Sequence, residues 1–206
     1  MKRIGLTQRV DVAECYAERR DGLDQRWGAL IHILGYLPVP LPNVGQAPVA
    51  YVEALKLDAL ILTGGNDIGE AIERDAFERE LVAVAIRTRT SLIGVCRGAE
   101  VLNLYFGGGI RRVPNHVGTR HCLVYGASVL DVWRDTSPVN SFHQHAILME
   151  DLADTFTHSA WTEDGVVEAF QHSNLPITGI MWHPERERPF RARDLAILRE
   201  VIERRL

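Results

Sequence analysis

Hydrophobic and polar positions along the first half of the chain alternate between short apolar runs and helical patterns. The apolar runs predict strands at residues 3–7, at YLPVPLP, at 58–62 and at 91–95. Helical spacing predicts helices at residues 18–35, about 48–56, about 75–89, and from the turn after residue 95 to the glycines at 107–109. Strands of nearly unbroken apolar residues between helices indicate a parallel sheet that is covered on both faces.

The second half of the chain is richer in strand patterns. Apolar runs predict strands at SVLDVW, TFTHSAW, VVEAF and ITGIMW, followed by an amphipathic helix with Leu195, Leu198, Val201 and Ile202 on its apolar face. The stretch PNVGQAP is the nearest thing to a linker, but it is too short to divide domains. We therefore expect a single domain over residues 1–206, with an α/β fold, a mostly parallel central sheet and a β-rich C-terminal portion.

Composition and charge narrow the function classes. The chain has 206 residues, of which 46% are hydrophobic and 24% are charged, as is ordinary for a globular protein. The formal net charge of −4 favours neither nucleic acid nor an anionic membrane surface as a partner. No apolar stretch approaches the roughly 18 residues that span a bilayer, and no apolar run follows the basic N-terminus, so we expect a cytoplasmic protein. The three cysteines match no zinc or redox spacing, which argues against a disulfide framework.

One of these cysteines follows the strand at residues 91–95, in the pattern Gly94-Val95-Cys96-Arg97-Gly98. The pattern has the form of a nucleophile elbow with cysteine in place of serine, and ligands of an open parallel sheet lie at such strand ends. The N–H groups at the start of the next helix favour a thiolate and can stabilise an oxyanion. Taken alone, the five residues are equally compatible with a buried structural cysteine before an ordinary turn.

A second motif at the end of a strand favours the catalytic interpretation. A cysteine nucleophile needs a histidine as base and acid, and the histidine needs an acceptor that fixes its tautomer. In ITGIMWHPER, His183 follows the strand and Glu185 comes two residues later, close enough to accept from the distal ring nitrogen. A lone His-x-Glu means little, but its position after an apolar strand and its pairing with the elbow indicate an active site.

These motifs carry a resemblance to a known family. GVCRG, the preceding TGG, VNSFHQHAI at 139–147 and EAFQHSNLPITGIMWHPER at 168–186 resemble the class I glutamine amidotransferase superfamily. Within it they are similar to the stand-alone γ-glutamyl hydrolases of the peptidase C26 type, which include γ-glutamyl-γ-aminobutyrate hydrolase. The resemblance covers about residues 3–190 and implies a flavodoxin-like three-layer α/β sandwich. It also implies that Cys96, His183 and Glu185 form a triad that hydrolyses a γ-glutamyl amide through a thioester, without a metal or an organic cofactor.

The resemblance further implies which groups surround the reacting carbonyl. The backbone N–H groups of Gly65 and Arg97 would hold the oxyanion. Asn140, Ser141 and His143 would bind the α-amino and α-carboxylate ends of the glutamyl group, unless these polar side chains only cap a turn.

The leaving group is harder to predict. IGLTQR, GGND, VNSFH and EAFQH resemble the small branch that hydrolyses γ-glutamyl-CDP-amidate. An anionic nucleotide requires cations, so Arg9, at the end of the first strand, and Arg97 are expected to face the cleft. Glu100 stands where the family usually has glutamine; its carboxylate can pair with an α-ammonium group but donates a hydrogen bond only when protonated.

Alternatives to a γ-glutamyl hydrolase remain open. The chain could be a glutaminase subunit that delivers ammonia to a separate synthase partner, or a non-enzymatic ligand-binding module that kept the fold. The hydrolase interpretation requires only a small-molecule γ-glutamyl substrate, and it leaves a homodimer open. Cys15 and Cys122 lack a glycine elbow and are expected to have no catalytic role. Five further histidines lack ligand spacing that demands a metal, so we expect them in loops or at the surface: His32, His116, His121, His158 and His172.

Overall fold

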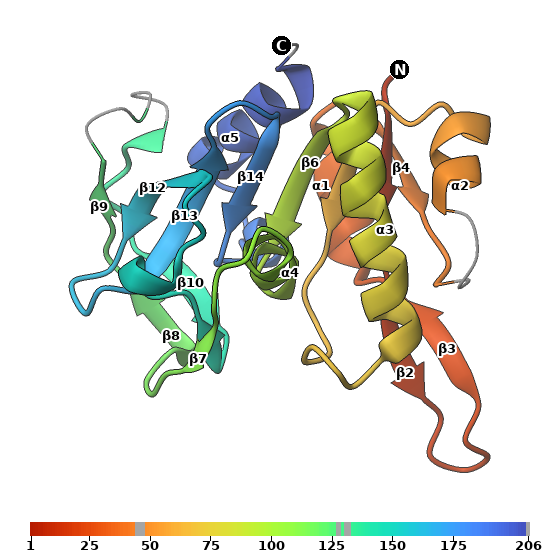
Figure 1. Ribbon diagram of the computed structural model, residues 1–206, viewed down its shortest axis with the longest axis horizontal. Helices are drawn as coiled ribbons and strands as arrows, with labels where there is room; N and C mark the ends of the chain where they lie inside the picture. Colours follow the sequence, from red (N-terminus) through yellow and green to blue (C-terminus); the bar gives the residue numbers. More distant parts are fainter. Residues whose placement is uncertain (44–47, 127–128, 130–132, 205–206) are drawn as a thin grey trace.

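A mixed eight-stranded sheet forms the centre of the computed structural model, which describes residues 1–43, 48–126, 129 and 133–204 (Figure 1). The strand order is β4-β1-β5-β6-β14-β13-β12-β9. In chain order the strands are β1 (Arg3–Leu6), β4 (Leu37–Pro40), β5 (Ala59–Leu62), β6 (Ser91–Val95), β9 (Val124–Tyr125), β12 (Phe156–Trp161), β13 (Val167–His172) and β14 (Ile177–Ile180). Neighbours from β4 to β14 run parallel, and those from β14 to β9 run antiparallel.

Helices cover both faces of this sheet, so the predicted three-layer α/β fold with a β-rich C-terminal portion is confirmed. The helices are α1 (Gln25–Ile33), α2 (Pro48–Ala54), α3 (Ile72–Thr88), α4 (Arg97–Tyr105) and α5 (Ala192–Glu203). Alternate side chains of each strand point to opposite faces. Ile61 of β5 therefore joins the core with α1 and α5, whereas Leu60 and Leu62 join the core with α2, α3 and α4.

The structure corrects the predicted first helix. Residues 18–35 do not form one helix, because Arg9–Val12 (β2) and Arg19–Gly22 (β3) pair as an antiparallel hairpin. The helix α1 begins only after Asp24, whose side chain accepts a hydrogen bond from the backbone N–H of Arg26 at 2.9 Å and so caps the N-terminus.

Short strands after α4 bring the VNSFH segment beside the main sheet. β10 (Val139–Phe142) pairs with β8 (Val117–His121), and β11 (His145–Ala146) pairs with β7 (Arg111–Arg112). The described part of the chain also contains two short 3₁₀ helices, η2 (Met149–Asp151) and η3 (Pro184–Arg186). The predicted linker at 42–48 and strand at SVLDVW fall largely on 44–47, 127–128 and 130–132, outside the described residues.

Among the described residues, none of the helices has both the length and the apolar character that a bilayer span needs. All three cysteines are free thiols, with Cys15 and Cys122 exposed and Cys96 buried.

Candidate active site

Cys96 occupies a tight turn between β6 and α4. Its φ is +53° and its ψ is −113°, a backbone conformation that residues other than glycine rarely adopt. The flanking glycines permit this turn, because a Cβ added at Gly94 would lie 2.4 Å from the carbonyl oxygen of Gly98. A Cβ at Gly98 would lie 2.1 Å from the carbonyl oxygen of Leu62. The sequence pattern thus folds into a strained elbow of the kind that exposes a nucleophile.

His183 and Glu185 meet at the carboxyl end of the neighbouring strand, β14. Nδ1 of His183 lies 2.7 Å from Oε1 of Glu185, and both side chains are buried. Since a carboxylate only accepts, this contact assigns the proton to Nδ1 and leaves Nε2 with a lone pair in the neutral ring. The imidazole is therefore fixed in the tautomer that can accept a proton from a thiol.

The structure brings Cys96 and His183 to one cavity of about 140 Å³. Glu100, His143 and Arg186 also line this cavity. Gly64, at the end of β5, packs directly against the ring of His183, since a Cβ there would lie 2.7 Å from His183 Cε1 and 3.6 Å from Cys96 Cβ. A glycine at this position therefore allows the imidazole and the cysteine to approach each other.

A buried ion-pair network behind the cavity holds the TGGN loop, and sequence reasoning missed it. Arg74 is fully buried and donates hydrogen bonds to three successive carbonyl oxygens, those of residues 63–65. Its Nε also donates to Glu78 at 3.0 Å. With these carbonyls fixed, Gly65 keeps a φ of +85° and lines the cavity beside Cys96. The contacts are consistent with the oxyanion role predicted for the Gly65 N–H, which stays a prediction.

The structure corrects the expectation that the Arg97 side chain faces the cleft. Its guanidinium is buried and pairs with the carboxylates of Glu78 and Asp75, as part of the same network. It is therefore not a cation for a bound phosphate. Only the backbone N–H of Arg97, at the start of α4, is directed toward the Cys96 thiol.

Asn140 and Ser141 make contacts that position other groups. The Asn140 amide nitrogen donates to the carbonyl of His183 at 2.9 Å, and its Oδ1 accepts from the His183 N–H at 2.9 Å. The Ser141 hydroxyl donates to the carbonyl of His116 at 2.6 Å. These bonds engage both side chains in holding the backbone of His183 and the β8–β10 pair. Substrate contacts for Asn140 and Ser141 stay a prediction, whereas His143 does line the cavity.

Electrostatics at the elbow favour a neutral thiol in the resting protein. Burial raises the pKa of Cys96, and the charge of Glu100 raises it further, while the Arg97 N–H opposes the rise. This differs from the low pKa that the helix N-terminus alone predicts. Burial also raises the pKa of Glu100 to about 7, partly offset by His143. A protonated Glu100 can donate a hydrogen bond, as the family's usual glutamine does.

We expect Glu100→Gln to change how stability depends on pH. The unfolded chain releases the Glu100 proton near its ordinary pKa of 4.5, whereas the folded protein keeps it up to about 7. Stability therefore falls as the pH rises through this window, by about 3 kcal/mol in total. Glutamine does not titrate, so urea unfolding at about pH 5 and pH 8 should show the variant gaining stability over wild type at the higher pH. Equal pH dependence of wild type, Glu100→Gln and the exposed control Glu80→Gln would contradict this assignment.

Two arginines lie at the mouth of the site. Arg9 is half exposed, pairs with Asp11 at 2.8 Å, and lines a second cavity with Gly64, Gly65 and His183. Arg186 lines both cavities and stacks on the Phe142 ring, with its guanidinium carbon 4.5 Å from the ring centre. Sequence reasoning missed Arg186, although it directly follows Glu185. The two side chains place guanidinium groups at this rim, which Asp24 and Glu185 also line.

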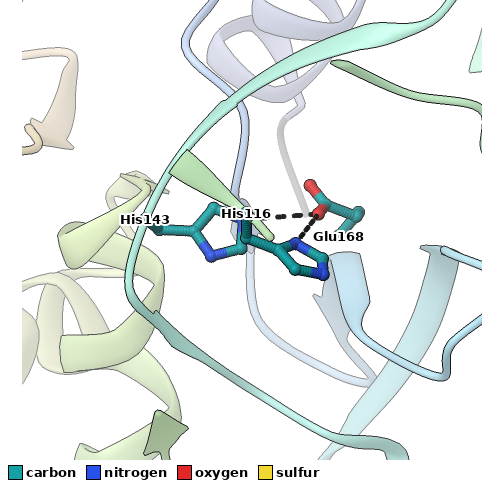
Figure 2. Close-up of side chains that lie close together, drawn as sticks. All are labelled: His116, His143 and Glu168. Atoms are coloured by element: carbon teal, nitrogen blue, oxygen red, sulfur yellow. Dashed lines mark ion pairs between the residues drawn. The ribbon is translucent and has the colours of Figure 1, made fainter. Parts of the chain in front are cut away.

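Of the five histidines that the sequence predicts in loops or at the surface, His116 lies in the loop between β7 and β8 but is not exposed. His116 is buried, and together with His143 and Glu168 it forms a group whose potential metal-ligating atoms all lie within 4.8 Å of one another (Figure 2). His121 packs against it, with the ring centres of His116 and His121 4.2 Å apart. His32 is exposed, and His158 and His172 are half buried, outside this cluster.

The three-layer fold and the cysteine elbow that faces a histidine across one cavity define a class I glutamine amidotransferase-like protein. A solved structure of a glutamine amidotransferase from Thermotoga maritima shares the fold, with a TM-score of 0.67 and 14% identity over 98% of this chain and 84% of that one. A family model described as Peptidase C26 matches residues 4–185. The chain belongs to the Peptidase C26 family of hydrolases.

Two relatives that are at least 30% identical to this chain have names that describe different activities. The chain is 32% identical over 193 residues to gamma-glutamyl-CDP-amidate hydrolase of Campylobacter jejuni, covering 89% of this chain and 90% of that one. It is 30% identical to anthranilate synthase component 2 of Azospirillum brasilense, covering 80% and 85%. These similarities agree on the family, but the names of the relatives describe different reactions and so do not identify the substrate of this chain.

Proposed function

We propose that this protein is a cysteine hydrolase that cleaves a γ-glutamyl amide bond through a γ-glutamyl thioester on Cys96. The observation that carries the proposal is the shared cavity of Cys96 and His183, with His183 Nδ1 2.7 Å from Glu185. Family membership supports it, because the family is one of hydrolases.

In the first half of the reaction, Cys96 Sγ attacks the γ-carbonyl carbon while its proton passes to Nε2 of His183. Because the resting thiol is neutral, this proton transfer accompanies the attack or follows substrate binding. The backbone N–H groups of Gly65 and Arg97 stabilise the oxyanion of the tetrahedral intermediate. His183 then protonates the departing nitrogen, the C–N bond breaks, and the glutamyl group remains as a thioester.

In the second half, His183 removes a proton from water, which attacks the thioester carbonyl. The second tetrahedral intermediate collapses, glutamate leaves, and the sulfur regains its proton from His183. Glu185 stabilises the imidazolium in both halves. The α-ammonium of the substrate pairs with Glu100 in its ionised form, and His143 lies near the same end of the cavity.

For the leaving group we propose a phosphate-containing amidate, of which γ-glutamyl-CDP-amidate is the specific candidate. Two observations support it. The similarity to the Campylobacter jejuni hydrolase extends over nearly the whole of both chains. Arg9 and Arg186 supply cations at the rim beside His183, and arginine is well suited to phosphate.

The proposal is tested by glutamate release from glutamine, γ-glutamyl-γ-aminobutyrate and γ-glutamyl-CDP-amidate. We expect the nucleotide amidate to give the highest kcat/KM. Arg9→Ala should raise KM for the nucleotide amidate by about tenfold, the loss of one exposed charge-assisted contact, and leave γ-glutamyl-γ-aminobutyrate nearly unchanged. Arg20→Ala is the matched control, because Arg20 lies on the other strand of the same hairpin and pairs with Glu18 at 2.7 Å.

Other patterns of glutamate release from the three amides would support a different substrate or a different class of protein. Equal or lower activity on the nucleotide amidate than on γ-glutamyl-γ-aminobutyrate contradicts the narrow assignment but keeps the hydrolase. Weak activity on glutamine alone, with ammonia release, favours a glutaminase subunit of the kind that the similarity to anthranilate synthase component 2 suggests. No activity on any of the three amides, with a folded protein, contradicts the proposed substrate class.

A further inference from the structure

We propose that His116, His143 and Glu168 form a zinc-binding site in the wall next to the active-site cavity. The three residues come from separate segments: the loop before β8, the residue after β10, and β13. Figure 2 shows their side chains converging, with His143 Nε2 3.4 Å and His116 Nδ1 3.9 Å from the same oxygen of Glu168. Two ligand atoms of a tetrahedral zinc ion are separated by about 3.3 Å, close to these distances.

The hydrogen bonds on the outer side of each ring fix the tautomers. His143 Nδ1 lies 2.9 Å from the carbonyl oxygen of His145, which can only accept, so Nδ1 carries the proton. His116 Nε2 lies 3.0 Å from the carboxylate of Asp164, so Nε2 carries the proton. In the neutral rings the inward nitrogens are therefore bare lone pairs. A metal-ligating histidine is oriented in the same way, by donating its other N–H to a carbonyl or a carboxylate.

The inward atoms have no hydrogen-bond partner among the described residues. His116 Nδ1, His143 Nε2 and both carboxylate oxygens of Glu168 are buried and unpaired. Two lone pairs facing a buried carboxylate repel each other unless a cation lies between them. A proton on His143 would pair one nitrogen with Glu168 and leave the His116 nitrogen facing the same oxygens. A divalent ion contacts both nitrogens and the carboxylate at once.

The ligand chemistry favours zinc. Two imidazoles and one carboxylate are a common set for Zn²⁺, whereas Mg²⁺ and Ca²⁺ prefer oxygen ligands. His121 packs on His116 and its Nε2 is also buried without a partner among the described residues, but His121 lies outside the group whose ligand atoms are within 4.8 Å of one another. The ion would tie the β8–β10 pair to the main sheet. It would thereby stabilise the wall that carries His143 and, through β10, Asn140, which holds the backbone of His183.

Zinc content and melting temperature test this site. All measurements use a Cys96→Ala background, because a thiol beside His183 could bind zinc by itself. After incubation with Zn²⁺ and dialysis, we expect one zinc ion per chain and a higher melting temperature than in chelator-treated protein. Glu168→Gln and His116→Gln should lose both the bound zinc and the increase. His158→Gln, which alters a half-buried histidine outside the cluster, should keep both.

Cobalt replaces zinc in a measurement that needs no change in the cluster. Bound Co²⁺ should give the visible bands of a tetrahedral site with nitrogen and oxygen ligands, without a thiolate charge-transfer band, and Zn²⁺ should abolish them. The proposal is overturned if the parent protein retains no zinc and shows no cobalt bands. It is equally overturned if folded Glu168→Gln and His116→Gln bind as much zinc as the parent.

Discussion

Cys96→Ala is expected to abolish glutamate release from γ-glutamyl amides, with a loss in kcat of at least about 10⁴-fold. The thiol is the only atom of this side chain that can form the thioester, and no other cysteine lines the described cavity. Alanine has the same backbone preferences at the positive φ of position 96, so the fold and its melting temperature should change little. Activity is measured by enzymatic detection of glutamate.

Cys122→Ala serves as the matched control, since Cys122 is an exposed free thiol. It should keep wild-type activity. Cys96→Gly adds an independent check on the elbow, because glycine relieves the strain at a φ of +53° and should raise stability by about 1 kcal/mol while remaining inactive. Activity of Cys96→Ala within about tenfold of wild type would contradict nucleophilic catalysis by this residue.

Glu185→Gln is expected to lower kcat by roughly 10²–10⁴-fold while leaving the histidine in place. Glutamine keeps the size of the side chain but loses the charge that stabilises the imidazolium. It can also present its amide N–H₂ to Nδ1, which would move the ring proton to Nε2 and remove the base. The measurement is kcat for the preferred substrate, together with the rate of Cys96 alkylation, which should fall in parallel.

Glu163→Gln is the control for this change, because Glu163 is an exposed glutamate remote from the triad motifs in sequence. Its activity should equal that of wild type. A Glu185→Gln protein with wild-type kcat would show that the contact at 2.7 Å serves structure only.

The sequence predicted the central sheet, the turn at Cys96 and the position of His183 at the end of a strand because these depend on local patterns. An apolar run that ends near a glycine indicates a strand such as β6, and a glycine on each side of Cys96 indicates the tight turn. The hairpin of β2 and β3 was missed because β2 is only four residues long and β3 has no apolar residue except its final glycine, so the short alternation in β2 has no matching pattern in its partner. The cap at Asp24 was a local signal that would have moved the start of α1 to its true position.

The rest of the site depends on contacts between distant segments. Arg74 and Glu78 have the spacing of an ordinary surface ion pair on a helix, yet both are fully buried beneath the TGGN loop. Apolar residues such as Phe77 and Leu81 share this face of α3, but the loop carbonyls and the Arg97 guanidinium that meet the two charges come from other segments. His116, His143 and Glu168 likewise come together only when three strand segments pair, so their spacing along the chain carries no metal motif.

The most direct test of the account is mass spectrometry of the protein quenched with acid during turnover of its preferred γ-glutamyl amide. A thioester on Cys96 predicts a fraction of the protein heavier by one glutamyl group, with the added mass on the peptide that contains Cys96 and removed by hydroxylamine. The adduct should be absent from Cys96→Ala, and Glu185→Gln, which slows both halves of the reaction, should form it more slowly than wild type. Turnover without such an adduct in either active protein, or an adduct on another residue, would contradict the thioester mechanism.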